Sequence, residues 1–597
     1  MLSGLRLGNF KAFSETQHVP IRPLTLIFGP NSSGKSSLIH GLLLAHEAIR
    51  EGKLDIHRTE IGGDSVDLGG FRQYVHRRDA GLQVEWAFEI SKDGFTERLH
   101  ELFPEAKNVS IGLTIGLSKY DISVLGDLAN LTPKEIYEAA LISVKEKGDK
   151  AALERLEEKK KEQSDFVTLT EKALLEGEVH VETFWIDIDE KRLLSMSHRD
   201  GNYLQLDSLD TEHTDFQKVI TFIVQNMTTT DKVESTDIAA MSKIIDDLVP
   251  KISFETTTFF PGKLRGKDFL SQKQQQTSLI PISKGRRKED LQNAMELFLP
   301  RILQDIVLGF SQIAEKEINR LTYLGPLRSY PPRHIAFSQF HDPNWQAGGG
   351  YTWDVVRTDH RIRALINNWL GDTKKLSTNY ELRIRNLLTV EDITSKHDDL
   401  SDKVIREIES EYVDGEIDDL FGELEQRIDE IPEKLKEFEP LLSDIQELVL
   451  FDKRTKTQVS HRDVGIGISQ VLPVLVTAYA SSNKIIAIEQ PEIHLHPALQ
   501  AELGDVFIDS ALGDNKNTFL IETHSEHLIL RILRRIRETT RGKNKKTPPI
   551  TPENVALLFV DVTKAGSIIQ ELKIDEQGRL IDQCPGGFFE EDFEELF

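Results

Sequence analysis

A glycine-rich segment near the start of the chain combines residue types that bind phosphate. Leu26 to Ile39 read LIFGPNSSGKSSLI, in which a glycine is followed after four residues by Gly-Lys-Ser. Backbone amides of such a loop cradle the phosphates of a nucleotide, and the lysine neutralises their charge. We therefore predict a site for ATP or GTP here, in preference to a purely structural glycine turn.

The residues of this P-loop have separate expected roles. Gly29 and Gly34 permit the turn and a close approach of the backbone to phosphate. Lys35 is expected to reach the β and γ phosphates, and the Ser36 hydroxyl to ligate Mg²⁺. The amides expected to face phosphate oxygens are those of Asn31, Ser32, Ser33, Gly34, Lys35, Ser36 and Ser37.

The elements around the loop must hold it at the edge of a sheet. Leu24 to Phe28 predict a short buried strand, and Ser36 to Ala48 an apolar-faced helix. Lys484 to Glu489 and Thr518 to Glu522 are apolar runs that end in acids, which is typical of central parallel strands with a site at their carboxyl ends. A P-loop needs a second carboxylate for Mg²⁺, and we assign it to Glu489, which lies 489 minus 35, or 454, positions after the lysine.

Changes of pattern divide the chain into four predicted segments. Residues 1–95 are strand-rich and contain the P-loop, whereas residues 96–320 turn helical and predict a mainly helical insertion. Residues 321–446 begin with a glycine- and proline-rich crossing and continue as short helices that Pro432 and Pro440 interrupt. Residues 447–597 return to strands and end in a hairpin-like pair at Val555 to Val562 and Ser567 to Ile574.

The composition excludes several classes of protein. With 597 residues, 39% of them hydrophobic and 29% charged, the chain can form several domains, and we find no apolar run able to span a bilayer. The amino end lacks the pattern of a signal peptide, and the single cysteine, Cys584, forms no internal disulfide. We expect a cytoplasmic protein that does not bind membranes.

The formal net charge of -25 argues against a surface that is basic throughout. Two local basic stretches remain, Arg531 to Lys546 and Lys284 to Lys288. Each is either a solvated surface or a patch for DNA or a partner. The candidate residues of the denser stretch are Arg534, Arg535, Arg537, Arg541 and Lys543.

The large separation in sequence between the P-loop and Glu489 resembles the arrangement in a known group of ATPases. Two half-heads separated by a long insertion are similar to the ABC-type ATPases of the SMC, RecF and OLD group, and LGNFKAF, GPNSSGKSS and IIAIEQPEIHLHP match their motifs in order. The resemblance covers residues 1–95 and 320–597. It implies an α/β head with a mixed central sheet, split by the insertion, that forms a head-to-head dimer around two ATP and Mg²⁺.

Further roles are implied only by this resemblance. Glycines and a serine in DVGIGISQ, which are Gly465, Gly467 and Ser469, occupy the place of a signature that contacts the nucleotide of the opposite subunit. His524 in IETHSEH corresponds to the switch histidine that senses the γ phosphate. The turn with His494 and His496 corresponds to the D-loop. Gln73 is a candidate for the Q-loop glutamine near the metal.

This chain departs from the resemblance where catalysis is concerned. The family's common pair is Asp then Glu, but here Gln490 follows Glu489. An amide orients water but cannot accept its proton, and the loss of a general base costs about 10² to 10⁴ in rate. We therefore expect tight ATP binding and slow hydrolysis, with Gln490 and His524 positioning the water. The alternative is that Glu492 or one of the two D-loop histidines replaces the base.

The most similar sequences imply a regulatory function. EQPEIHLHP and the segment Pro585 to Phe597 resemble ATPase subunits of bacterial anti-phage systems such as Septu and PARIS, which control a separately encoded nuclease or toxin. The alternative is a RecF- or SMC-like ATPase of DNA repair, although the chain has no long heptad array. A transporter subunit is disfavoured by the insertion. We expect no nuclease activity, because Asp561 and Asp575 lack the rest of a metal cluster.

Overall fold

A computed structural model describes most of both halves of the predicted head. The described residues are 1–117, 179–199, 203–227, 235–256, 259–265, 282, 286–329, 344–372, 375, 378–387, 445–459 and 466–582. Several predicted features lie outside them. These are the segment 133–163, most of the helices expected between 398 and 448, Gly465, Lys284, Cys584 and residues 585–597.

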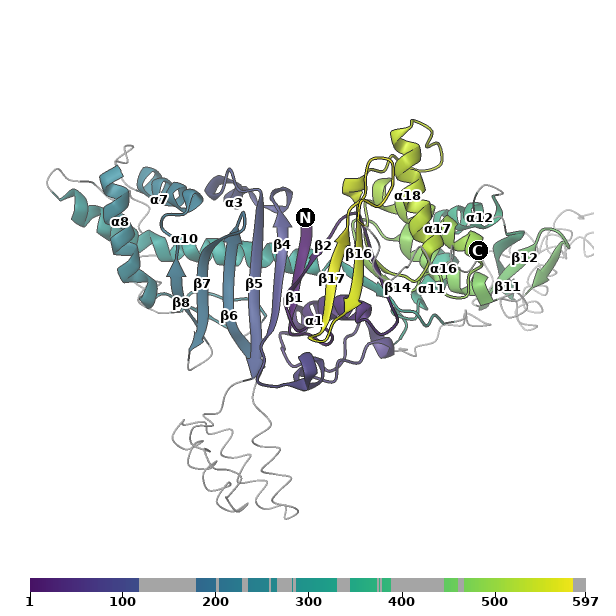
Figure 1. Ribbon diagram of the computed structural model, residues 1–597, viewed down its shortest axis with the longest axis horizontal. Coiled ribbons are helices and arrows are strands. Elements are labelled where there is room, and N and C mark those ends of the chain that lie inside the picture. Colours follow the sequence, from purple (N-terminus) through teal and green to yellow (C-terminus); the bar gives the residue numbers. More distant parts are fainter. Residues whose placement is uncertain are drawn as a thin grey trace, which may run out of the picture.

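An antiparallel sheet of eight strands fills one half of the molecule (Figure 1). Its strand order is β2-β1-β4-β5-β6-β7-β8-β9. The bounds in that order are Gln17–Pro20, Leu2–Gly8, Val84–Ser91, Asn108–Leu117, Val179–Ile188, Lys191–Arg199, Tyr203–Leu209 and Ser253–Glu255.

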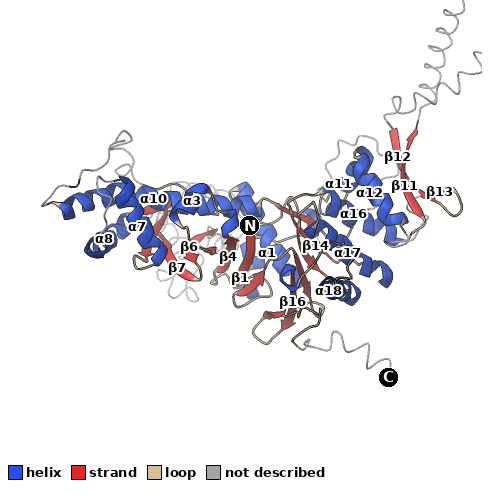
Figure 2. Cartoon of the chain, turned by 90° about the horizontal axis from the view of Figure 1, so that it is seen from above, coloured by secondary structure: helices blue, strands red, loops and turns tan. Residues whose placement is uncertain are grey.

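Helices cover one face of this sheet, as the view from above shows (Figure 2). They are α3 (Glu97–Leu102), α7 (Thr214–Met227), α8 (Ser235–Leu248) and α10 (Arg287–Ile318). Within α10, Glu289–Ile318 is long and apolar enough to cross a membrane by length and composition, which the sequence did not predict. The best apolar window is 61% buried, and the helix packs on α7, α8 and β5 as a core helix does.

The prediction of a mainly helical insertion from residue 96 is incomplete. Strands β5 to β9 add to β1, β2 and β4, so the sheet crosses the predicted boundary at residue 95. The signal was present in the sequence, because Val109, Ile111, Leu113 and Ile115 alternate along β5 and enter one core. Such a period of two marks a strand.

A second sheet of six strands carries the P-loop. Its order is β10-β14-β15-β3-β16-β17, and all neighbours are parallel except the last pair. The bounds in that order are Leu321–Leu324, Ile485–Glu489, Thr518–Glu522, Leu24–Phe28, Val555–Val562 and Ser567–Leu572. The predicted α/β fold class, with a mixed central sheet and an insertion, is therefore confirmed, as are the three central strands and the terminal hairpin.

The second sheet separates two hydrophobic cores. Ile27 of β3 enters the core shared with the first sheet, α1 (Lys35–Glu51) and α10, whereas Leu26 and Phe28 enter the opposite core. That opposite core includes α16 (Ile466–Ala480), α17 (Pro497–Leu512) and α18 (Glu526–Thr540). Because both faces are covered, the carboxyl ends of these strands are held rigidly where the site is expected.

The remaining elements are smaller. A three-stranded sheet is formed by β11 (Tyr380–Leu387), β12 (Ile445–Asp452) and β13 (Thr457–Val459). Helices α11 (Tyr351–Thr358) and α12 (His360–Gly371) pack against α16, and α2 (Phe71–Tyr74) is a single turn. Short 3-10 turns lie at Gly63–Ser65, His76–Arg78, Lys92–Gly94, Val249–Lys251 and Pro552–Asn554.

Candidate nucleotide site

The P-loop leaves β3 and enters α1 in a conformation that only its glycines permit. Gly29 has a φ of 144°, and a Cβ there would lie 2.3 Å from the Val560 carbonyl oxygen. Gly34 has a φ of 93° and caps α1. The loop tip at Asn31 is exposed, so its amides are open to a ligand.

Lys35 is folded back over its own loop. Its Nζ donates to the carbonyl oxygens of Gly29 at 3.2 Å and Pro30 at 2.7 Å, and the residue is only 4% exposed. Burial lowers the pKa of Lys35, while Glu522 and Glu492 oppose that shift. The buried Ser33 Oγ beside it has no hydrogen-bond partner. A curled ammonium and an unused hydroxyl in a glycine-built loop fit the phosphates of a nucleotide.

Two carboxylates end adjacent strands beside the loop. Glu489 on β14 and Glu522 on β15 are register partners. The Ser36 hydroxyl donates to Glu522 Oε2 at 2.7 Å, whereas Glu489 Oε1 accepts from the Tyr323 hydroxyl at 3.0 Å. Burial and the charge of Glu489 raise the pKa of Glu522 to about 7. The sequence predicted Ser36 with Glu489, and the structure brings Ser36 to Glu522 instead.

Glu489 also belongs to a chain of polar contacts that leads to Lys11. His40 Nε2 of α1 lies 3.4 Å from Glu489 Oε1, and the Lys11 Nζ lies 2.7 Å from His40 Nδ1. Burial lowers the pKa of His40, so its ring is mostly neutral at pH 7. Burial also lowers the pKa of Lys11 to about 8, against the attraction of Glu489. The folded protein therefore keeps Lys11 charged at neutral pH at a cost in stability.

Replacement of Lys11 with methionine tests this cost. The Lys11 pKa is about 8 in the folded chain and 10.5 ordinarily, so between these values the unfolded chain binds the extra proton and folding gains stability as pH rises. Lys11→Met removes the titrating group. The free energy of unfolding of this variant, relative to that of the original chain, should therefore be higher at pH 7 than at pH 10 by on the order of 2 kcal/mol. Chemical unfolding at both pH values measures the difference. The control Lys53→Met, at an exposed lysine, should show no such change with pH. An equal difference between Lys11→Met and the original chain at both pH values would contradict the assignment.

Gln490 lies in a strained turn that a buried arginine holds. Its φ is 45°, a left-handed conformation that is uncommon outside glycine, and its amide donates to the Glu522 carbonyl at 2.8 Å. Arg328 donates from Nη2 to the carbonyl oxygens of Glu489 at 2.9 Å and Gln490 at 3.1 Å. The Gln470 side chain of α16 donates to the Arg328 carbonyl at 3.1 Å. Arg328 therefore fixes the turn against α16, a role that the sequence did not indicate beyond an ordered crossing.

Glu492 connects this turn to the loop of His524. Its Oε1 accepts from the His524 amide at 2.6 Å, and the residue is only 7% exposed. Burial raises the pKa of Glu492. His524 lies two residues after the end of β15, and burial together with Lys35 lowers its pKa. Its ring is therefore mostly neutral at pH 7, so it can donate one hydrogen bond and accept another.

The two candidate D-loop histidines lie in a turn and at its exit. Both side chains are exposed, and His494 has a φ of 63°. His496 is the N-cap of α17 and accepts from the Ala498 amide at 3.3 Å. His496 takes the N-cap position because Pro497 starts α17, and the first turn of a helix needs an N-cap.

The candidate signature residues are only partly placed for contact with another subunit. A Cβ on Gly467 would lie 2.8 Å from the His494 carbonyl oxygen, so the start of α16 packs on the D-loop turn. Ser469 is completely buried within this chain, so its side chain has no surface to offer a second subunit. Gly465 lies outside the described residues. Gln73 is exposed on α2, and no contact between described residues joins it to Ser36 or Glu489.

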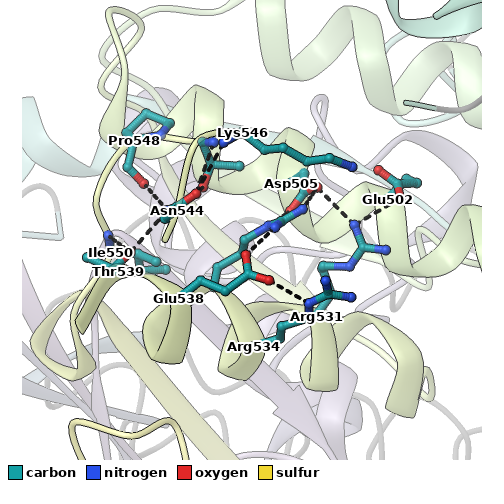
Figure 3. A network of polar contacts seen from close by, with 12 residues as sticks. Glu502, Asp505, Arg531, Arg534, Glu538, Thr539, Asn544, Lys546, Pro548 and Ile550 are labelled. Carbon is teal, nitrogen blue, oxygen red and sulfur yellow. Dashed lines mark hydrogen bonds and ion pairs between the residues drawn. The ribbon is translucent and has the colours of Figure 1, made fainter. Parts of the chain in front are cut away.

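The basic stretch of α18 is largely paired within the chain (Figure 3). Arg535 is 4% exposed and binds Asp505 through Nε at 2.6 Å and Nη2 at 2.5 Å. Arg534 binds Glu538 at 2.8 Å, and Arg537 and Arg541 donate to Gln577. The other candidates, Arg534, Arg537, Arg541 and Lys543, are exposed. The hypothesis of a free basic patch is therefore wrong for Arg535 and weakened for its neighbours.

Metal binding here requires oxygens from a ligand as well as from the protein. Among the described residues no group of three or more His, Cys, Asp or Glu side chains could hold a metal ion. Ser36 with one or two strand-end carboxylates fits Mg²⁺ only where phosphates supply further ligands, as they do in nucleotide sites.

Comparisons with known proteins agree with this chemistry. Residues 354–529 match a family described as AAA ATPase domain, a range that contains Glu489, Gln490 and His524. Residues 550–597 match a protein family of unknown function, DUF3696. No curated protein matches. Together with the α/β fold and the P-loop, the match to the AAA ATPase domain supports ATPase activity for the chain.

Solved structures with some likeness are heads of Smc proteins. The SMC head domain from Thermotoga maritima is 8% identical, with 96% of this chain and 99% of that chain covered and a TM-score of 0.31. An Smc head of Pyrococcus furiosus bound to the C-terminal domain of ScpA is 11% identical, with 96% of each chain covered and a TM-score of 0.31. These scores are too low to carry a conclusion about this chain.

Proposed function

We propose that this chain is a nucleotide switch that binds ATP with Mg²⁺ tightly, hydrolyses it slowly and self-associates in the ATP state. The observation that supports it best is the arrangement at the carboxyl edge of the second sheet. There the folded-back Lys35 and the Ser36 hydroxyl of the glycine-built loop lie beside two strand-end carboxylates, one of which accepts from Ser36. Bound Mg²⁺ would spread the negative charge of the β and γ phosphates.

The residues of this chain have distinct parts in that function. Lys35 would leave the carbonyls of its own loop and donate to phosphate oxygens. Gln490 would orient the attacking water through its amide, and neutral His524 would donate to the γ phosphate. Glu492 is a poor substitute base, because its Oε1 is held by the His524 amide at 2.6 Å and the residue is only 7% exposed.

Self-association is supported by what surrounds the P-loop. The exposed histidines His494 and His496 and the exposed loop tip at Asn31 provide polar surface for a second copy. Gly467 packs on the same turn, so the start of α16 would move together with it. We propose a head-to-head dimer around two nucleotides, or a larger oligomer built from such dimers.

The finer role that we propose is the regulatory subunit of a bacterial anti-phage complex in the cytoplasm. A slow ATPase carries information in its nucleotide state, and a separately encoded nuclease or toxin would respond to that state. The internal pairing of Arg535 and Arg534 argues against the α18 stretch as a dedicated DNA surface. Nucleic acid would then be contacted through the partner or through a local patch such as Lys543.

Purification of the tagged chain from its native gene neighbourhood tests this role. A stoichiometric nuclease or toxin that is retained with ATP and released without it is the expected result. Recovery of the chain alone, or of DNA held in an ATP-dependent way, would favour the repair-type alternative.

Replacement of Gln490 with glutamate tests the slow turnover. The variant restores a carboxylate general base, so kcat for ATP should rise by about 10- to 100-fold. Steady-state phosphate release at saturating ATP is the measurement. Adding Lys35→Met to the Gln490→Glu variant should remove the increase in kcat, which would assign that increase to this site. An unchanged kcat would show that another group already acts as the base.

A further inference from the structure

We propose that Glu522, rather than Glu489, is the carboxylate that holds the metal of the bound nucleotide together with Ser36. This inference rests on the proposed function. It assigns the metal to the strand that carries the switch histidine, and it gives Glu489 a different task.

The first observation is the contact that Ser36 makes. Its hydroxyl is the group of a P-loop that ligates the metal, and in this chain it donates to Glu522 Oε2 at 2.7 Å. Two oxygens at that separation can share one cation, because Mg²⁺ binds oxygen ligands at about 2.0 to 2.1 Å and adjacent octahedral ligands then lie about 2.9 Å apart.

The second observation is the order of the strands. β15 lies directly beside β3, which leads into the P-loop, whereas β14 lies one strand further away. Neighbouring strands are about 4.8 Å apart. The backbone of Glu522 is therefore closer to the phosphate site than that of its register partner Glu489, by about one strand spacing.

The third observation concerns the partners of Glu489. Its Oε1 accepts from the Tyr323 hydroxyl at 3.0 Å and lies 3.4 Å from His40 Nε2. Tyr323 belongs to β10, which flanks β14 on the side away from β15. Glu489 is thus held by neutral donors as a fixed part of the wall, and its backbone carbonyl is held by Arg328.

The fourth observation concerns the charges around Glu522. Glu489 and Glu492 both repel the Glu522 charge, and Lys35 attracts it. Glu489 also attracts Lys11, and Glu492 lies near the Arg328 guanidinium, so each of these two carboxylates has a cation of its own. A divalent cation at Ser36 and Glu522 would join Lys35 in neutralising Glu522.

The consequence is a direct mechanical link to the switch. Glu522 is followed by Thr523, whose amide donates to the Ile27 carbonyl of β3, and then by His524. When Glu522 exchanges the Ser36 hydrogen bond for the metal, the loop that carries His524 must adjust with it. The metal state of the site would thereby be communicated to the histidine that faces the γ phosphate.

The test compares two matched substitutions in the full chain, Glu522→Gln and Glu489→Gln. The probe is Mn²⁺, followed by its electron paramagnetic resonance signal in the presence of saturating ATPγS. We expect Glu522→Gln to weaken Mn²⁺ binding by at least about 10-fold and Glu489→Gln by less than about 3-fold. Binding of fluorescent ATP in EDTA then measures, for each variant, the part of the change that does not depend on the metal.

Two further variants protect the test against trivial failure. Ser36→Ala should weaken Mn²⁺ as Glu522→Gln does, and the double variant should be no weaker than the worse single, because both side chains serve one ion. Glu522→Asp keeps the charge and should recover part of the affinity if the loss does not come from misfolding. The inference would be overturned if Glu489→Gln lost Mn²⁺ binding while Glu522→Gln bound Mn²⁺ nearly as the original chain does. Equal, small effects would overturn it as well while the proposed function stands, whereas an original chain that binds no nucleotide would overturn both.

Discussion

Replacement of Lys35 with methionine is expected to weaken ATP binding by about 100-fold or more. The side chain keeps its length but loses the ammonium that donates to the Gly29 and Pro30 carbonyls. In the bound state the same ammonium would donate to phosphate oxygens, and hydrogen bonds of charged groups contribute about 1.5 to 3 kcal/mol each. A loss of about 3 kcal/mol corresponds to about 100-fold in Kd.

A titration with a fluorescent ATP analogue in Mg²⁺ measures this effect. Lys53→Met is the matched control, because its side chain is 73% exposed and pairs only with Glu51 at 3.7 Å at the end of α1. The control should bind as the original chain does. If Lys35→Met bound ATP within about threefold of that value, the P-loop would not be the nucleotide site.

Replacement of Asp505 with alanine is expected to destabilise the protein by about 3 to 5 kcal/mol. Asp505 is 3% exposed on α17 and accepts from Arg535 through both oxygens and from Arg531 Nη1 at 2.9 Å. Its charge and those hydrogen bonds raise the pKa of Arg535. Without the carboxylate, the buried guanidinium of Arg535 keeps its ion pair with Glu538. The pair of Arg531 with Glu502 then remains as an ion pair between α18 and α17 (Figure 3).

Urea unfolding, followed by circular dichroism, measures the loss. Arg534→Ala is the control from the same network, since its side chain is 61% exposed and an exposed ion pair contributes less than about 1 kcal/mol. A larger effect for Arg534→Ala than for Asp505→Ala would show that the stretch is not a structural clamp. It would return the basic residues to the list of candidate binding groups.

The parts of the fold that local patterns determine were predictable. The P-loop sequence specifies its own turn, because Gly29 and Gly34 occupy backbone conformations that other residues rarely adopt. The strands before Glu489 and Glu522 are buried on both faces and therefore appear as continuous apolar runs. The order of motifs along the chain was sufficient to place the loop, both acids and His524 at one edge of a sheet.

The pairing of side chains within that edge was not predictable. Ser36 and Glu522 are 486 positions apart, and only the placement of β15 between β14 and β3 brings them together. Arg328 gave no local signal, because its partners are backbone carbonyls of residues more than 140 positions away. The charge of α18 was misleading in the opposite way, because Arg531 and Arg535 pair with Asp505 of α17, which precedes them by 26 and 30 positions.

Sedimentation velocity of the full chain with Mg²⁺ and no nucleotide, ADP or ATP tests the central claim most directly. A change from one copy to two, or from one oligomer to its double, is expected with ATP and not with ADP. Lys35→Met should remain in the nucleotide-free state under every condition. An identical sedimentation coefficient in all three states, under conditions where ATP binding is verified, would contradict a switch in which nucleotide controls self-association.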